Sequence, residues 1–456
     1  MFKGTKQVIN MTEGPLLGKM IRFTLPLIFT NLLQLFYNSA DMFVVGNFCE
    51  DPNALGSVGC TGSIVNLILG LMLGLSAGVS VTISQSMGSG DKKRVERAVR
   101  TTITLALVVG VFVGIMGFFL APVLLKVMKT PEVFIKKATL YVKIYFAGTI
   151  GNTMFNFCSG ILRSRGDTLR PLIFSSVGGI VNVILNVIFV LVFNMGVEGV
   201  AIATIIAQAI SAVLTLVHLS RLDDECKINC KNLGIDKGIL FNFIRIGLPA
   251  GVQGMLFSFS NMLLQGSYNR LGPLYVNANT AAQNVDGYIY NVMAAFYHTA
   301  LNFSSQNFGA KKYDRMWKVF GLNCMCDVVV GLSLGLLSIA FSAPLIGIFD
   351  SDPAVIKEAQ SRLLIMGLFY FTCGLMDTST AMLRSLGKSL TATIITVFGV
   401  CGIRVFWIYT VFAAFPQLIV LYIVYPVTWV LTFVALTIAF IISFKKYFKK
   451  EKLKSA

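Results

Sequence analysis

Twelve long stretches with few or no charged side chains recur along this chain of 456 residues. Each is near or above the roughly 20 residues that a helix needs to cross a bilayer. The last is too long for one span and divides near Phe415–Pro416, so that its first part continues the run before it. The runs lie at about 23–47, 54–86, 101–125, 138–162, 171–193, 199–219, 246–268, 276–308, 319–342, 363–383, 389–403 and 405–444.

The composition agrees with this pattern. Hydrophobic side chains make up 55% of the chain and charged ones 13%, and the mean hydropathy is +0.75. A soluble enzyme is excluded because its surface needs more charge than this chain offers. The sequence therefore predicts an all-α integral membrane protein with twelve transmembrane helices and no strands.

The chain has a net charge of +17, and its charged side chains are distributed as the predicted topology requires. Lysines and arginines gather at the N-terminus, in alternate loops (92–100, 163–170, 311–318, 384–388) and in the tail, while acidic side chains occupy most of the intervening loops. Four lysines at 126–137 run against this pattern. The distribution is the positive-inside bias, which places both termini in the cytoplasm. We expect contact with anionic lipid headgroups and no nucleic-acid partner.

The chain repeats itself once at an offset of 221–223 residues. The pattern R-x-x-L-P at 22–26 returns at 245–249, S-Q-x-x-G at 84–88 returns at 305–309, and L-R-S-x-G at 162–166 returns at 383–387. Six predicted helices per half is an even number, so the halves are parallel repeats related by a pseudo-two-fold axis along the membrane normal. We predict an N-lobe at 1–220, a cytoplasmic linker at 221–242 and a C-lobe at 243–456.

One aspartate interrupts the first apolar run. Between Arg22 and Glu50 the only charged side chain is Asp41, and a charge at that depth costs at least about 2.5 kcal/mol, so it is usually retained for binding or proton relay. Gln34 and Asn38 lie on the same helix face as Asp41, at spacings i, i+4 and i+7. A structural aspartate bonded to neighbouring amides is the alternative. The other ionisable residues predicted inside the membrane are Asp286, His298, Asp327, Asp377 and Arg404.

Two further predicted helices carry polar groups that suit a hard cation. Asn182 and Asn186 lie four residues apart on one face of the fifth helix, and Thr204 follows in the sixth. Carboxylate, amide and hydroxyl oxygens are ligands that Na⁺ accepts, so Asp41, Asn182, Asn186 and Thr204 form the candidate cation-coupling site. Hydrogen bonding between helices explains the two asparagines equally well.

The segments "RFTLPLIFTNLLQLFYNSADMFVVG", "SQSMGSGDKKRVERAV", "GILRSRGDTLRPL" and "AMLRSLGKSLTATI", in this order and duplicated, resemble the multidrug and toxic compound extrusion (MATE) family over essentially the whole chain. The resemblance implies two six-helix bundles around a central cavity that export organic cations in exchange for Na⁺ or H⁺. It also implies an N-lobe cation site at Asp41 and the matching positions of helices five and six, although several relatives have an aspartate at the position of Asn186. An acidic cavity residue in helix ten matches Asp377, whose alternative role is an ion pair with Arg404.

The substrate cavity is expected to be lined by polar, aromatic and methionine side chains, because ring faces attract organic cations and methionine adapts to irregular ligands. Phe257 stands where another branch of the family has a glutamate, so a C-lobe Na⁺ site of that kind is not expected. The candidates for the cavity are Gln34, Tyr37, Asn38, Met42, Phe155, Phe257, Met262 and Tyr288.

The expected function is secondary active efflux of organic cations by alternating access, with Na⁺ or H⁺ as the coupling ion and no cofactor or structural metal. A lipid-linked oligosaccharide flippase of the same superfamily is the alternative. The G-x-S-x-G pattern at 74–78 falls inside a predicted helix, where it cannot form a hydrolase elbow, so no enzyme is expected. We expect a monomer in a bacterial cell membrane.

Overall fold

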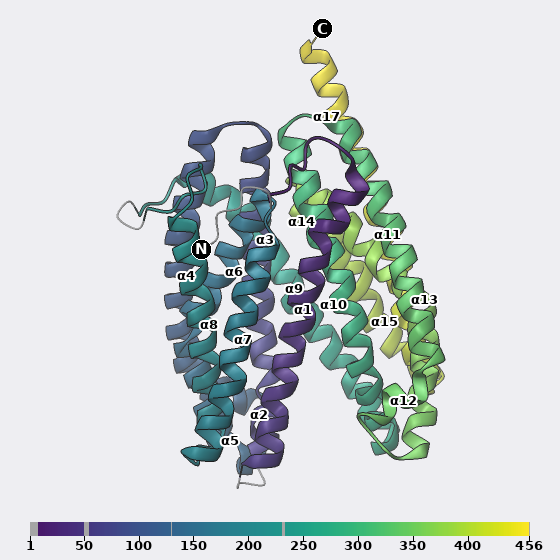
Figure 1. Ribbon diagram of the computed structural model, residues 1–456. Coiled ribbons are helices and arrows are strands. Elements are labelled where there is room, and N and C mark those ends of the chain that lie inside the picture. Colours follow the sequence, from purple (N-terminus) through teal and green to yellow (C-terminus); the bar gives the residue numbers. More distant parts are fainter. Residues whose placement is uncertain (1–7, 50–53, 129, 230–232, 456) are drawn as a thin grey trace. The chain divides into compact units, whose positions relative to one another are not determined.

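The computed structural model describes residues 8–49, 54–128, 130–229 and 233–455, and these residues contain helices and no strand (Figure 1). The prediction of an all-α protein is confirmed. The helices of the first half are α1 Leu16–Phe48, α2 Ala54–Gly59, α3 Gly62–Gly88, α4 Lys92–Val127, α5 Glu132–Ala147, α6 Thr149–Arg165, α7 Leu169–Val187 with the π-helical η2 Ile188–Val192, and α8 Val197–Ser220.

The second half repeats this succession of long helices. They are α9 Lys237–Leu271, α10 Pro273–Gly309, α11 Tyr313–Ala340, α12 Ser342–Gly347, α13 Pro353–Ser385, α14 Ser389–Thr396, the π-helical η3 Val397–Gly402, α15 Ile403–Tyr409, α16 Val411–Ala414 and α17 Leu418–Ser455. The last predicted run divides near Phe415–Pro416 as expected, because α16 ends at Ala414 and α17 begins at Leu418.

Ten helices in the described part of the chain are long and apolar enough to cross a membrane. The two other predicted spans correspond to the α5–α6 pair and to α10, which is long but carries many polar side chains. The α5–α6 span is broken at Gly148, where a side chain would lie 2.1 Å from the Cγ2 atom of Ile205 in α8. This close approach explains the glycine. Together these helices make the twelve predicted spans, six in each half.

The repeat is visible in the backbone as well as in the sequence. Gly166 and Gly387, the last residues of the two L-R-S-x-G segments, both have positive φ angles of 95° and 73° at helix ends. Gly90 (φ 73°) and Lys311 (φ 59°) form a second matching pair after α3 and α10. Glycine adopts this left-handed conformation without the steric cost that a lysine pays.

The chain divides into two compact units. The first contains residues 1–10 and Leu25–Gly247, and the second contains Met11–Thr24 and Leu248–Ala456. These bounds differ in three places from the predicted lobes, since residues 11–24 belong to the second unit, and both the predicted linker 221–242 and the first residues of the predicted C-lobe, 243–247, belong to the first. The terminal residues 1–7 and 456, which bear on the predicted cytoplasmic termini, and the acidic loop residues 50–51 lie outside the described residues.

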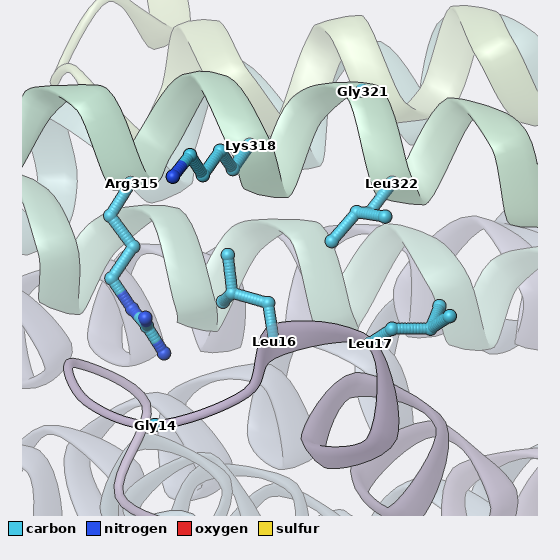
Figure 2. Close-up of a pocket in the computed structure, with 7 residues that line it drawn as sticks. All are labelled: Gly14, Leu16, Leu17, Arg315, Lys318, Gly321 and Leu322. Atoms are coloured by element: carbon cyan, nitrogen blue, oxygen red, sulfur yellow. The ribbon is translucent and has the colours of Figure 1, made fainter.

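Side-chain contacts explain why residues 11–24 join the second unit. Arg315 of α11 donates from Nε to the carbonyl oxygen of Met11 at 3.2 Å and from Nη2 to that of Glu13 at 2.8 Å. Figure 2 shows the Arg315 side chain pointing from α11 toward the loop that contains Gly14. Further along α1, the ring of Phe23 packs edge-on against Phe303, with centroids 5.5 Å apart.

The predicted linker is held on the first unit by hydroxyl groups of α4. The backbone amide of Gly234 donates to Thr104 Oγ1 at 3.0 Å, and that of Asp236 donates to Thr101 Oγ1 at 3.1 Å. The Asp236 carboxylate also accepts from the backbone amide of Ile239, at the start of α9, and pairs with Arg97 at 3.2 Å. The hydrogen bond from the Ile239 backbone amide and the nearby Arg97 guanidinium hold the pKa of Asp236 below its usual value.

Candidate functional site

A pocket of about 200 Å³ lies inside the first unit, between α1, α3, α5, α6, α7 and α8. Polar side chains from five of these helices face it, and Asp41 is the sole acidic residue among the described residues that line it. No lysine or arginine is among the described residues that line it. The lining residues are Gln34, Tyr37, Asn38, Asp41, Leu69, Leu73, Tyr145, Asn152, Phe155, Asn156, Ser175, Gly178, Gly179, Asn182, Thr204, Ala207, Gln208 and Ser211.

Asp41 is 8% exposed and accepts hydrogen bonds from two helices. Asn186 of α7 donates from Nδ2 to Asp41 Oδ1 at 2.5 Å, and Thr204 of α8 donates from Oγ1 to Asp41 Oδ2 at 3.3 Å. Asn182 completes the group by donating from Nδ2 to Thr204 Oγ1 at 3.3 Å. The structure thus brings together the four residues that the sequence proposed as a cation-coupling site.

The local sequence explains how α7 presents both asparagines. Asn182 and Asn186 are one helical turn apart, and both are buried. The π-helical segment η2 begins at Ile188, directly beyond this turn, and π turns within helices often occur at functional sites. Asn186 Oδ1 is buried without a hydrogen-bond partner, so it remains free to accept a hydrogen bond or to ligate a cation.

Asp41, Asn182 and Thr204 face a pocket whose described lining residues include no lysine or arginine. A bare carboxylate at such a depth is unfavourable, and a bound cation or proton removes the cost. The arrangement can therefore hold one monovalent cation, with Asp41 supplying the charge and its neighbours supplying neutral oxygens. Na⁺ and a proton both satisfy this chemistry.

The remaining predicted cavity residues separate into three groups. Gln34, Tyr37, Asn38 and Phe155 line the same pocket as Asp41. Met42 follows Asp41 in α1 but is exposed and does not line it. Three residues belong to the second unit: Phe257 packs against its hydrophobic core, and Met262 and Tyr288 are exposed.

Comparison with known proteins identifies the family. The MatE family model matches this chain twice, over residues 26–188 and 249–410. The chain belongs to the MatE family. The matches begin at Pro26 and Pro249, which the internal repeat had already paired, so the duplication predicted from the sequence is confirmed.

Individual relatives span most of this MatE chain. The probable multidrug resistance protein YpnP of Bacillus subtilis is 27% identical over 85% of this chain and 86% of its own length. The probable multidrug resistance protein NorM of Thermotoga maritima is 25% identical, with coverage of 88% and 86%.

The fold has close counterparts among solved structures. An outward-facing MATE family multidrug resistance transporter of the MOP superfamily superposes with a TM-score of 0.90 at 20% identity, covering 98% of this chain and 100% of its own. A MOP superfamily transporter from Pyrococcus furiosus, described as having a binding pocket of reverse polarity, also gives a TM-score of 0.90 at 20% identity, with coverage of 97% and 99%. At these identities the likeness establishes the fold, and it agrees with the two-lobe, twelve-helix architecture.

Several pocket residues of the MatE chain were missed by the sequence analysis. They follow the spacing that revealed the Asp41 face: Gln208 and Ser211 lie four and seven residues after Thr204, and Ser175 lies seven before Asn182. Applying the same helical period to helices five and six would have found them. Asn152 and Tyr145, in the fourth predicted span, are two more of the missed pocket residues, and Asn152 donates from Nδ2 to the Tyr145 hydroxyl at 3.4 Å.

Asp377, the second predicted acidic site, lies in α13 of the second unit, half-buried. Its alternative role as the partner of Arg404 is not observed among the described residues. Arg404 instead donates from Nη1 to Asn261 Oδ1 at 3.0 Å, and its guanidinium lies over the Tyr425 ring, 4.4 Å from the centroid. Asp377 therefore remains a carboxylate without an ion-pair partner among the residues that the structure describes.

Replacing Gly179 with alanine is expected to destabilise the pocket by about 1–3 kcal/mol, the usual cost of overpacking. A Cβ atom at Gly179 would lie 1.8 Å from Tyr37 Cε2, so the ring or the helix must move. Thermal unfolding of the purified variant measures the effect. Gly287→Ala in α10 is the matched control, since nothing lies within 4 Å of its added atom. Equal melting temperatures for the two variants would contradict the close contact.

Proposed function

We propose that this MatE protein is a secondary active efflux transporter that exports organic cations across the membrane in exchange for Na⁺ or H⁺ by alternating access. The observation that carries the proposal is the first-unit pocket, in which a buried carboxylate is surrounded by neutral oxygens and by no lysine or arginine among the described lining residues. The relatives are named as multidrug resistance and multidrug export proteins, which supports a broad range of substrates.

Exchange is favoured by electrostatics. Expelling one monovalent cation against an inside-negative potential of about 100 mV costs about 2.3 kcal/mol for the charge alone. The entry of one Na⁺ or proton in the same cycle offsets that term. Asp41 is suited to this task because a single carboxylate holds one positive charge at a time, so arrival of the coupling ion displaces the organic cation.

Aromatic and polar side chains give the pocket its selectivity in this proposal. Tyr37 and Phe155 offer ring faces to an organic cation, and the amides of Gln34 and Asn38 offer hydrogen bonds. Asp377 would add a second acidic site in the second unit. The exposed Met262 and Tyr288, and the half-buried Phe257, are proposed as substrate contacts of that unit.

The wider assignments follow from this function. We propose a multi-pass protein of a bacterial cell membrane that works as a monomer with both termini in the cytoplasm. The protein carries out no covalent chemistry and needs no cofactor other than the coupling ion. Its partners would be small organic cations and membrane lipids, with no nucleic acid.

A flippase for lipid-linked oligosaccharides is the second candidate, because a structural neighbour in the same superfamily is described as having a pocket of reverse polarity. A pyrophosphate-linked lipid carries negative charge and requires basic side chains. The first-unit pocket offers a carboxylate instead, and its described lining contains no lysine or arginine. The charge of this pocket favours an organic cation as substrate.

Transport into inverted membrane vesicles tests the proposal. A fluorescent organic cation such as ethidium is expected to accumulate when a Na⁺ or an H⁺ gradient is imposed separately, and the effective gradient identifies the coupling ion. Vesicles without the protein are the control. Accumulation that responds to neither gradient would contradict ion-coupled export, and translocation of a labelled lipid-linked saccharide would favour the flippase.

A further inference from the structure

The second unit contains a fully buried carboxylate that the proposed function has not used. Asp327 lies in the middle of α11 and is 0% exposed. Thr378 of α13 donates from Oγ1 to Asp327 Oδ2 at 2.6 Å. Asn323, one turn earlier in α11, donates from Nδ2 to Thr378 Oγ1 at 2.6 Å and to Asp327 Oδ2 at 3.5 Å.

Two oxygens of this group have no hydrogen-bond donor. Asp327 Oδ1 and Asn323 Oδ1 are both buried without a partner, and Asn323 is also 0% exposed. Neither oxygen can donate, so what the site lacks is a positive charge or a proton. No lysine or arginine within the described ranges forms an ion pair with Asp327.

Another buried carboxylate of the same unit shows the contrast. Asp286 of α10 is also buried, at 4% exposed, and its Oδ1 likewise has no partner. Unlike Asp327, however, it has an arginine: Arg362 donates from Nε to its Oδ2 at 2.8 Å and from Nη1 to Asn279 Oδ1 at 2.7 Å. Asp286 is therefore compensated as an anion. An uncompensated anion at Asp327 would be strongly disfavoured in the same surroundings. An isolated carboxylate in an apolar interior costs so much free energy that it takes up a proton instead.

A neighbouring carboxyl group makes an anionic Asp327 still less favourable. Asp377 precedes Thr378 in α13 and interacts with Asp327 as a like charge. The other titratable groups near the two carboxylates are Cys324 and Cys326 on α11, Cys373 on α13 and Tyr290 on α10. All four are neutral in their ordinary state. Arg384 donates to Tyr297 and Gln253, and Arg404 donates to Asn261, so neither arginine pairs with Asp327.

Helix α13 packs closely against the open carboxylate oxygen. A Cβ atom at Gly374 of α13 would lie 3.0 Å from Asp327 Oδ1 and 2.2 Å from the Met293 methyl group. The glycine allows α13 to pass directly over the carboxyl group, and this close packing leaves a proton as the positive charge that fits beside Asp327 Oδ1. The geometry favours a proton over a metal cation.

We propose that Asp327, with Asn323 and Thr378, forms a proton-binding site of the second unit, in which Asp327 is a neutral carboxylic acid that releases its proton when an organic cation binds beside Asp377. The O–H bond of Asp327 breaks, the proton passes to water, and the new carboxylate is compensated by the arriving cation, so charge is conserved. The release step rests on the proposed export function, whereas the protonated state does not.

Infrared spectroscopy of the purified, reconstituted protein tests the protonated state without transport. A carbonyl stretch of a buried carboxylic acid is expected at neutral pH, and its intensity is expected to fall in Asp327→Asn, which keeps the shape of the protonated side chain. Asp314→Asn, an exposed acid in the first turn of the same helix, is the control that should retain the band. A band that is equally strong in Asp327→Asn overturns the inference.

Thr378→Val provides a second variant in case Asp327→Asn fails to fold. Loss of the hydroxyl that donates to Asp327 Oδ2 is expected to shift the carbonyl band while leaving its area unchanged, and an unshifted band overturns the inference. Proton release on addition of tetraphenylphosphonium, followed with a pH dye, then tests coupling. The unchanged protein is expected to release protons, and Asp327→Asn is expected to release at least one proton fewer; equal release overturns the coupling step. Absence of transport in the unchanged protein would defeat the export function but leave the infrared result standing.

Discussion

Asp41→Asn is expected to reduce ion-driven export of an organic cation by about tenfold or more, without unfolding the protein. The asparagine occupies the same volume and can still meet Asn186 and Thr204, but it no longer carries the charge that attracts a cation. A hydrogen bond or contact with a charged group contributes about 1.5–3 kcal/mol, and about 1.4 kcal/mol corresponds to a tenfold change. Fluorescent-cation accumulation in inverted vesicles, at matched protein levels, measures the loss.

The control for this experiment is Asp223→Asn. Asp223 is an exposed acid in the loop after α8 and does not line the pocket, and its neutralisation makes the same change in net charge. Export by this variant should equal that of the unchanged protein. Undiminished ion-driven export by Asp41→Asn would remove Asp41 from the mechanism and leave it with a structural role alone.

Arg362→Met is expected to lower the stability of the second unit by about 3–5 kcal/mol, the usual cost of removing one partner of a buried ion pair. The substitution leaves Asp286 as an uncompensated buried carboxylate and deprives Asn279 of its donor. It also removes the stacking of the guanidinium on Tyr422 and Tyr425, whose centroids lie 5.6 and 5.1 Å away. Thermal unfolding in detergent, followed by size-exclusion chromatography of the heated protein, measures the change.

Two further variants separate the buried pair from a general effect of charge. The double variant Arg362→Met with Asp286→Leu should be more stable than the single one, because no charge remains unpaired. Glu225→Gln, which breaks the exposed pair with Lys92 at 2.5 Å, should have almost no effect on the melting temperature. A single Arg362→Met variant as stable as the unchanged protein would show that Asp286 does not depend on its partner.

The helical spans were predictable because their cause is local. An apolar run of sufficient length forms a helix in a bilayer whatever surrounds it, since its backbone polar groups must be satisfied within the segment. The break between α16 and α17 was found from Phe415–Pro416. The break at Gly148 was missed, because it depends on the approach of Ile205 from another helix, and no local pattern reports that distance.

The ion pair between Asp286 and Arg362 was also only partly visible in the sequence. Asp286 was noticed as an ionisable residue in an apolar run. Arg362 lies just before the run at 363–383, so it was not counted among the residues inside the membrane. Only packing places the two side chains 2.8 Å apart, 76 residues away from each other in the chain. Asp327 was noticed in the same way, and its lack of a counter-charge became visible only with its neighbours in place.

The sequence by itself determined the membrane class, the twelve spans, the duplication and the helix faces that carry Asp41 and its polar neighbours, because these depend on side-chain composition and helical periodicity. The tertiary structure decided which faces meet. It joined Asp41 to Asn186 and Thr204, added the stripes of α6 and α8 to one pocket, and separated a compensated carboxylate from an uncompensated one in the second unit. Distances between helices and the burial of charge are properties of packing, so the sequence pattern could not predict them.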